Sequence, residues 1–382
     1  MSAEMSEHVF NIVEANSIKY NNLVYELKAS GQDLIVLSLG EAFFDIPLYS
    51  FSDLPSPDIY HYGHSRGLLP LREQLADYYF SQYGVAVDAS SEILITAGSK
   101  VALFMVFASI ISPGDEVLIC EPAWVSYTEQ IKLCFGTPVG IPVGVPLDGF
   151  EKFITNKTRA IVINNPNNPC GRSYSRDDLH ALVNLAKKHN IFLISDEAYS
   201  DFCLDGAFVS AGIFDDEKGN VIVCNSMSKN YGMSGWRLGY VIAHKKFINE
   251  ILKVNQHLIT CPANILQLYM AKYFHTILGI TKPQIDSVLQ LRAKLSEYID
   301  EVGLKRLPGD ATFYFFISVS PSKLSSDQFC EQLIKDYHVS AVPGIGYGES
   351  CDRFIRVSFG SESVARIKTG LDRIKTLIQI TS

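Results

Sequence analysis

Short apolar runs alternate with longer helix-like stretches along the chain from about residue 92 to residue 274. The helical spacing is clearest at 176–190, where leucine, valine and alanine recur at i, i+3, i+4 and i+7 with charged residues between them. The predicted strands are 92–96, 116–120, 160–164, 191–195 and 220–224, and the predicted helices are 99–111, 127–135 and 176–190. Apolar strands separated by helices are typical of a mostly parallel sheet that is covered on both faces.

A second unit follows a long helical stretch at about 282–302. Its predicted strands, 313–319 and 354–359, are mixed with predicted helices at 326–337 and 361–377. This mixture indicates a smaller α+β unit, joined by residues near the N-terminus. A chain of 382 residues is also too long for one ordinary core. We therefore expect two domains with the functional site at their junction.

Composition narrows the class of protein. Apolar residues make up 47% and charged residues 19% of the chain, as in compact globular proteins. The net charge of −8 gives no electrostatic reason to expect nucleic acid or an anionic membrane as a partner. The longest nearly apolar run, 101–111, is shorter than the roughly 18 residues of a membrane-spanning helix. The N-terminus, with two glutamates and no lysine or arginine in its first ten residues, does not read as a signal peptide.

The eight cysteines show no CxxC or mixed cysteine–histidine spacing, and the nine histidines show no HxxxH or HExxH pattern. We therefore expect reduced thiols, a cytoplasmic protein and no metal site.

The most informative segment is Ser-Met-Ser-Lys-Asn-Tyr-Gly-Met-Ser-Gly-Trp-Arg, which ends at Arg237 and follows a predicted strand. Its lysine, Lys229, stands just past the strand's carboxyl end, where open α/β sheets bind ligands. A lysine that forms an imine with an aldehyde cofactor needs a partly desolvated position, because burial lowers its pKa. Ser226, Ser228 and Arg237 could hold a phosphate beside it. A solvated loop lysine is the alternative, and the whole run of residues makes it the minority interpretation.

Two further strand ends carry polar residues. Asp196 ends an apolar strand, and such a carboxylate can be buried opposite a protonated pyridine nitrogen, although aspartate is also a common helix N-cap. Tyr199, three residues later, could donate to a phenolate oxygen. The segment 164–171, Asn-Asn-Pro-Asn-Asn-Pro-Cys-Gly, is rich in turn residues, and one of its asparagines could point at the site.

Other candidates are an anion pocket, a stacking surface and a buried cation. Gly98, Ser99 and Lys100 link a strand to an apolar helix whose first N–H groups could bind an anion, without the nucleotide P-loop pattern. Trp124 offers a flat surface for an aromatic ring or is an ordinary core residue. Arg356 lies in an otherwise apolar strand, which implies a carboxylate partner, either structural or on the substrate.

These segments, in this order, resemble the pyridoxal-phosphate-dependent aminotransferases of the aspartate aminotransferase family (class I and II, fold type I), from about residue 36 to the C-terminus. The resemblance implies the following set of cofactor-binding residues: Gly98, Ser99, Lys100, Trp124, Asn168, Asp196, Tyr199, Ser226, Ser228, Lys229 and Arg237. In it, Lys229 would hold pyridoxal 5'-phosphate as an imine and move the proton. Asp196 would pair with the ring nitrogen, Tyr199 and Asn168 would contact the ring oxygen, and Trp124 would stack on the ring.

The resemblance also implies substrate contacts and a partner subunit. Arg356 would bind the substrate α-carboxylate, with Gly40 and Asn168 beside the substrate. Tyr62 would reach the phosphate of a second subunit, so a homodimer is expected. The implied fold is a large domain, 46–285, with a mostly parallel seven-stranded sheet between helices, and a small α+β domain formed by 1–45 and 286–382.

The implied reaction moves an amino group between an amino acid and a 2-oxo acid with ping-pong kinetics. Elimination, cyclisation or oxidation on the same scaffold is the alternative, and a non-enzymatic binding module is disfavoured because no basic DNA-binding extension precedes the domain. The segment 41–47 departs from the family's usual GEPDFDTP, and Cys170 replaces the commoner threonine. Phe43 and Phe44 suggest tolerance of apolar substrate side chains, and the sequence shows no further unambiguous cation for a second carboxylate.

Overall fold

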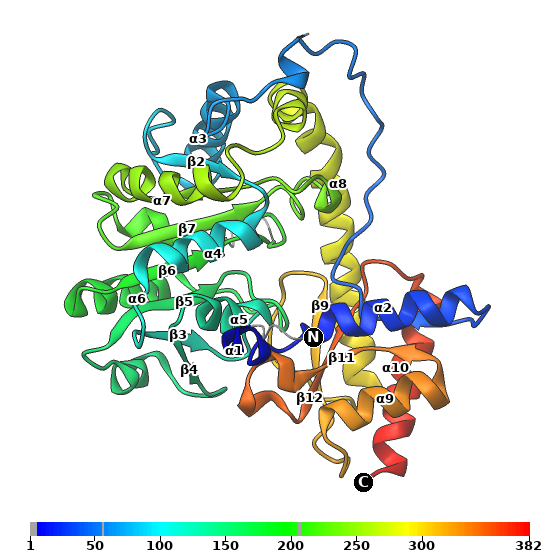
Figure 1. Cartoon of the computed structure of the whole chain (residues 1–382). Coiled ribbons are helices and arrows are strands. Elements are labelled where there is room, and N and C mark those ends of the chain that lie inside the picture. Colours follow the sequence, from blue (N-terminus) through cyan, green and yellow to red (C-terminus); the bar gives the residue numbers. More distant parts are fainter. Residues whose placement is uncertain (1–5, 56, 205–207) are drawn as a thin grey trace, which may run out of the picture.

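A seven-stranded sheet forms the centre of the larger part of the molecule (Figure 1). The computed structural model describes residues 6–55, 57–204 and 208–382. The strand order is β2-β8-β7-β6-β5-β3-β4, and β8 alone is antiparallel to its neighbours. The strands are β2 (Ile93–Thr96), β3 (Glu116–Cys120), β4 (Thr137–Ile141), β5 (Thr158–Asn164), β6 (Phe192–Asp196), β7 (Val221–Ser226) and β8 (Gly239–Ile242). The predicted mostly parallel sheet is confirmed.

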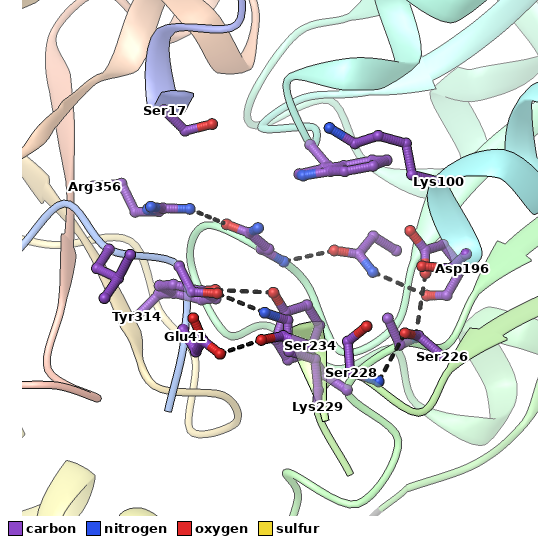
Figure 2. Close-up of a pocket in the computed structure, with 18 of the residues that line it drawn as sticks. Ser17, Glu41, Lys100, Asp196, Ser226, Ser228, Lys229, Ser234, Tyr314 and Arg356 are labelled. Atoms are coloured by element: carbon purple, nitrogen blue, oxygen red, sulfur yellow. Dashed lines mark hydrogen bonds between the residues drawn. The ribbon is translucent and has the colours of Figure 1, made fainter. Parts of the chain in front are cut away.

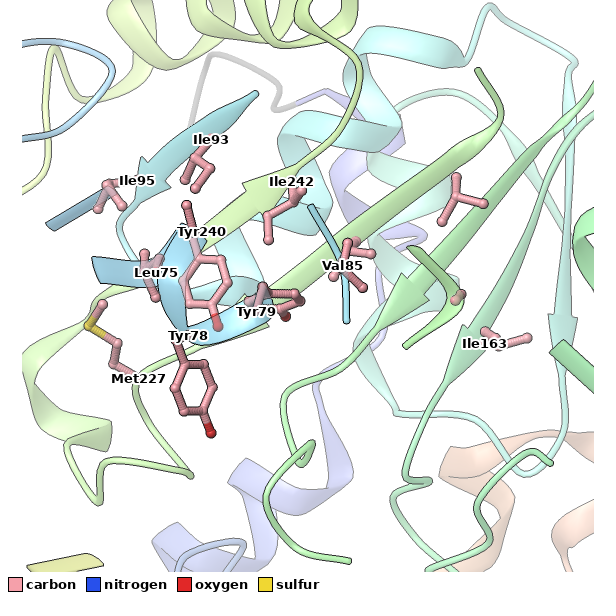
Figure 3. Packing of buried hydrophobic residues seen from close by; sticks show 14 of the residues in the cluster. Leu75, Tyr78, Tyr79, Val85, Ile93, Ile95, Ile163, Met227, Tyr240 and Ile242 are labelled. Atoms are coloured by element: carbon pink, nitrogen blue, oxygen red, sulfur yellow. The ribbon is translucent and has the colours of Figure 1, made fainter. Parts of the chain in front are cut away.

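Helices cover both faces of this sheet, because alternate strand residues point to opposite faces and both sets are apolar. On one face pack α4 (Ser99–Ile110), α5 (Ser126–Leu133) and α7 (Lys245–Leu258). On the other pack α3 (Leu69–Tyr83), α6 (Arg176–His189) and the first half of α8 (Asn264–Glu301). Figure 3 shows the second core, in which Leu75 and Tyr79 of α3 meet Tyr240 and Ile242 of β8.

Two small sheets and their helices form the second unit. They are the parallel pair β1 (Ile35–Val36) and β10 (Val339–Ser340), and the antiparallel set β11 (Val342–Pro343), β12 (Phe354–Ser358) and β9 (Tyr314–Ser318). Around them lie α2 (Asn16–Ala29), α9 (Ser326–Tyr337) and α10 (Val364–Ile380), whereas α1 (Glu7–Phe10) lies beside α5 of the large unit. Their core is continuous with the second half of α8. The predicted smaller α+β unit is therefore present.

Helix α8 connects the two cores and is much longer than predicted. It begins at Asn264 rather than near 282 and continues through Pro283. Its residues up to Leu278 pack in the core of the large sheet, and those from Ile285 pack in the core of the small unit. The expected domain boundary at 285/286 falls in this helix and stays a prediction, which the division of the two cores supports.

Strand β8 is absent from the sequence prediction. Strand β4 is also absent, and for a physical reason. It contains Pro138 and Gly140, which both disfavour strands. The structure places it at the edge of the sheet, paired only with β3, where a missing N–H can be tolerated. Strand β4 could be recognised as a strand only from its pairing with β3 in the structure.

Three chemical features of the described residues bear on the class of protein. None of their helices is both long and apolar enough to cross a membrane. All eight cysteines are free thiols. No cluster of three or more histidine, cysteine, aspartate or glutamate side chains within these ranges is arranged to hold a metal ion.

Candidate active site

A cavity of about 290 Å³ lies between the two units, at the carboxyl ends of β5, β6 and β7 (Figure 2). In sheets of this kind, ligands bind outside the carboxyl ends of the strands. The cavity is lined by most of the residues that the sequence singled out: Gly40, Ser99, Lys100, Trp124, Asn168, Asp196, Tyr199, Ser226, Ser228, Lys229, Arg237 and Arg356. Residues more than 300 positions apart are thus brought to one site.

Lys229 lies on the wall of this cavity with a largely desolvated ammonium group. Its Nζ donates to the carbonyl oxygen of Gly40 at 2.5 Å. Burial lowers the pKa of Lys229 to about 8, although the carboxylate of Glu41 acts in the opposite direction. A substantial fraction of the neutral amine is therefore present near pH 8, which is the form that attacks a carbonyl carbon.

Asp196, the last residue of β6, is a buried carboxylate at the far side of the cavity from Arg356 (Figure 2). One of its oxygens accepts from the hydroxyl of Tyr127 at 2.6 Å, and the other accepts from the N–H of Ala198 at 3.2 Å. Burial raises the pKa of Asp196 to about 6, and no cation of the described chain pairs with it. A cationic ring nitrogen would supply the missing partner.

An anion pocket lies at the start of α4. Gly98 is its N-cap residue, with φ of +86°, and a Cβ at this position would come within 2.4 Å of the Arg237 guanidinium. Arg237 donates to the backbone carbonyl of Ser234 at 2.6 Å and reaches the hydroxyl of Ser228 at 3.4 Å. The first N–H groups of α4, the hydroxyls of Ser226 and Ser228 and the guanidinium of Arg237 together suit a phosphate group.

Lys100 contributes its side chain as well as its backbone N–H. Its ammonium lies 5.1 Å from the centre of the Trp124 ring, and burial together with Arg237 lowers its pKa. The cavity therefore has a further cation on its wall, which the sequence did not reveal as such.

Arg356 is a buried cation at the opposite end of the cavity, with 3% of its surface exposed. It donates to the backbone carbonyl of Ser38 at 2.6 Å and to the side-chain oxygen of Asn168 at 3.4 Å, and its guanidinium lies 4.6 Å from the ring centre of Tyr314. Its Nε has no partner, and no carboxylate among the described residues forms an ion pair with it. The structural salt bridge considered from the sequence is not observed, so a carboxylate of the substrate fits this position.

The structure adds cavity residues that the sequence analysis did not single out individually. They are Ser17, Asn21, Leu39, Glu41, Asn164, Ala198, Ser234 and Tyr314. The carboxylate of Glu41 accepts a hydrogen bond from Ser234, and the hydroxyl of Tyr314 is 2.9 Å from that of Tyr199. The sequence signal that could have identified some of them is a polar residue directly beside a predicted site residue, as Glu41 is beside Gly40.

Four residues singled out from the sequence do not line the cavity. Gly98 lies directly behind it as the N-cap of α4. Tyr62 is 86% exposed in the single chain, so its role in a second subunit stays a prediction. Phe43 is exposed, and Phe44 packs against the small-unit core. The expectation that these two phenylalanines favour apolar substrates has no support in the geometry, because neither side chain lines the cavity.

The raised pKa of Asp196 leads to a prediction about stability. Asp196 holds its proton more tightly in the folded cofactor-free protein than in the unfolded chain. This difference stabilises the fold fully below about pH 4, and the stabilisation is lost as the pH rises through about 6. Asp196→Asn should therefore stabilise the cofactor-free protein at pH 8 by about 1–3 kcal/mol, and by little at pH 4. Thermal unfolding at both pH values measures this difference.

Asp215 is the matched control for that experiment. Burial alone would raise its pKa, but the N–H groups of Asn220 and Val221 and the ammonium of Lys187 outweigh it, and the pKa is lowered. Asp215→Asn should destabilise at pH 8. Stabilisation by both substitutions, or by neither, would contradict the assignment of an unpaired charge to Asp196.

The fold and the cavity together define the class of protein: a mostly parallel seven-stranded sheet that carries a desolvated lysine between an anion pocket and a buried carboxylate is the arrangement of the fold type I aminotransferases. The chain belongs to the aminotransferase class I and II family, whose model matches residues 50–374. Members of this family use pyridoxal phosphate and act on amino acids and 2-oxo acids. The protein is therefore an aminotransferase, and amino group transfer is favoured over the other reactions considered from the sequence.

Individual relatives agree over nearly the whole chain. The aromatic-amino-acid aminotransferase 2 of Thermococcus litoralis is 28% identical, over 93% of this chain and 94% of its own length. The (5-formylfuran-3-yl)methyl phosphate transaminase of Methanocaldococcus jannaschii is 31% identical, over 98% and 99%. The structure of Thermus thermophilus aspartate aminotransferase with maleate superposes with a TM-score of 0.87, at 27% identity, and covers 98% of this chain and 100% of that one.

Proposed function

We propose that this aminotransferase binds pyridoxal 5'-phosphate in the cavity and holds it covalently through Lys229. The observation that carries the proposal is the buried lysine amine, with its pKa lowered to about 8, between an anion pocket and a buried carboxylate that lacks a cationic partner. The phosphate would take the N–H groups of α4 with Ser226, Ser228 and Arg237. The flat ring would fit against Trp124, with Asp196 at its nitrogen and Asn168 and Tyr199 at its oxygen.

The residues of the chain then have separate tasks. When bound, the cofactor supplies an electron sink for the electrons of the broken Cα–H bond. Asp196 keeps a proton on the ring nitrogen, because a buried carboxylate favours a cation beside it. Lys229 would be the group that accepts the proton from the substrate Cα and later gives it back, because its neutral form is accessible near neutral pH.

The substrate is proposed to be an α-amino acid whose carboxylate binds Arg356. This guanidinium has an unused N–H and no ion-pair partner in the described chain, and Asn168 lies beside it. A two-pronged contact would fix the direction of the Cα–H bond as well as the charge.

Absorbance spectroscopy of the purified protein tests the proposal directly. Single additions of L-aspartate, L-glutamate, L-phenylalanine, L-tyrosine and L-alanine should convert the cofactor spectrum to that of its aminated form, and 2-oxoglutarate should reverse the change. Ammonia release or oxygen uptake would instead indicate another reaction. A spectrum that none of the amino acids alters would reject an α-amino acid donor from this panel. Strict selectivity for aspartate would contradict the tolerance of apolar side chains expected from the sequence.

A homodimer with composite sites is also proposed, because Tyr62 is highly exposed in the single chain and outside its own cavity. Mixing Tyr62→Ala subunits with Lys229→Ala subunits should recover activity, since one of the two sites in the hybrid dimer is then intact. Activity of the mixture against each parent measures this, with subunit exchange verified by differently tagged chains. Tyr25 is another exposed tyrosine, and Tyr25→Ala replaces Tyr62→Ala in the control mixture. No recovery after proven exchange would refute a shared site.

A further inference from the structure

Arg292 is a buried guanidinium that joins the two units behind the cavity. It lies in α8 with 1% of its surface exposed, and no carboxylate of the described chain forms an ion pair with it. Burial lowers its pKa to about 10, so it stays charged at neutral pH. An unpaired buried cation is costly, and its cost must be offset by other contacts.

Those contacts are three backbone carbonyl groups from separate segments. Arg292 donates to the carbonyl oxygen of Tyr314, to that of Gly309 at 2.8 Å and to that of Cys170 at 3.1 Å. The guanidinium also lies 4.5 Å from the ring centre of Phe315, which supplies a stacking surface. A planar guanidinium with several fixed N–H donors can satisfy carbonyls that approach from three separate segments at once.

Each of these segments leads to the active site. Cys170 follows Asn168 by two residues in a turn of the large unit, and Asn168 lines the cavity. Tyr314 belongs to β9 of the small unit, where its ring lies under the guanidinium of Arg356 and its hydroxyl meets that of Tyr199. Arg292 therefore holds the backbone of both elements that place groups around Arg356.

The joint is also closely packed. A Cβ at Gly309 would come within 2.4 Å of the carbonyl oxygen of Cys170, so the two segments approach as closely as their backbones permit. Beside it, the N–H of Ala311 donates to the carbonyl oxygen of Gly171 at 3.0 Å, and that of Thr312 donates to the carbonyl oxygen of Phe202 at 3.0 Å. Such a joint leaves little freedom for the two segments to shift.

We propose that Arg292 is a positioning residue that fixes Asn168 of the large unit relative to Tyr314 and Arg356 of the small unit, and so sets the geometry of the carboxylate site. The inference rests on the proposed function of Arg356. Arg292 touches neither substrate nor cofactor. It acts through the backbone, and a displacement of about 1 Å at a reacting group can cost roughly 10²-fold in rate.

Arg292→Met tests this, with Arg306→Met as its matched control. Arg306 approaches the same Phe315 ring, at 5.9 Å, but pairs with Asp300 and contacts none of the three carbonyls. With the best donor of the panel above and 2-oxoglutarate as acceptor, Arg292→Met should lower kcat/KM by about 10- to 100-fold, mainly by raising KM for the amino acid. Arg306→Met should change it less than about threefold.

A double-mutant cycle with Arg356→Ala separates positioning from loss of stability. If Arg292 acts through the carboxylate site, adding Arg292→Met to Arg356→Ala should lower kcat/KM by less than about threefold further. The same factor in both backgrounds, or equal losses for Arg292→Met and Arg306→Met, would overturn the proposal. If Arg356→Ala alone has no effect, the proposed function of Arg356 fails instead, and the two failures are distinguishable.

Gly309→Ala keeps the cycle decisive if Arg292→Met does not fold. The added methyl group would come within 2.4 Å of the Cys170 carbonyl oxygen, so the two segments must move apart although the Arg292 side chain is retained. It should raise KM for the amino acid in the wild-type background and have little further effect beside Arg356→Ala. Gly279→Ala, in open space on the same helix α8, is its control and should leave KM unchanged. A KM unaffected by Gly309→Ala would contradict the proposal.

Discussion

Replacing Lys229 with alanine should nearly abolish amino transfer, by roughly 10²–10⁴-fold or more, because the proton transfer and the covalent attachment are lost together. The amine of Lys229 has a lowered pKa and donates a hydrogen bond only to the carbonyl oxygen of Gly40. Among the described residues that line the cavity, Lys100 is the one other lysine. The visible absorbance band of the lysine-bound cofactor should disappear, with the cofactor then bound only non-covalently.

Lys100 provides the control for that experiment. Its ammonium lies on the same cavity wall, beside Trp124, and its pKa is also lowered. Lys100→Ala should keep the visible band, and borohydride reduction of the wild type followed by peptide mapping should label Lys229 alone. A label on Lys100 would overturn the assignment of the covalent residue.

Replacing Arg356 with alanine should lower kcat/KM by roughly 30- to several-thousand-fold, the equivalent of about 2–5 kcal/mol for a buried charge pair. Arg356→Lys should also lower kcat/KM strongly. A lysine ammonium lacks the planar pair of N–H donors that can bind a carboxylate while the same group contacts Ser38 and Asn168. The decisive comparison is an amino acid against the amine that lacks its carboxyl group. If the wild type uses both equally well, the carboxylate assignment is wrong.

Arg353 is the internal control for Arg356. It donates to the backbone carbonyls of Ser320, Ser322 and Leu324 and lies outside the cavity. Arg353→Ala should therefore lower thermal stability, through three unpaired carbonyls, and leave the discrimination between amino acid and amine unchanged.

The sheet and much of the cavity could be predicted because the information is local. Apolar runs of four to seven residues identify buried strands, and parallel strands gather their carboxyl ends at one edge. Asp196 and Ser226, each the last residue of its strand, and Lys229, just beyond, are therefore placed together by strand-end position alone. Strand β4 and the early start of α8 escaped prediction, because proline and glycine in an edge strand, or proline inside a helix, carry the opposite local signal.

The sequence by itself determined which chemical groups stand at the strand ends: an amine, a carboxylate, hydroxyls and guanidinium groups in a fixed order. Tertiary structure alone decided how they behave. The pKa values of Lys229 and Asp196 are set by burial, and the partners of Arg356 and Arg292 are mostly backbone carbonyls that every residue possesses. Desolvation and such contacts depend on atoms that are a few ångströms apart in space and up to 318 residues apart in the chain, so no local pattern could specify them.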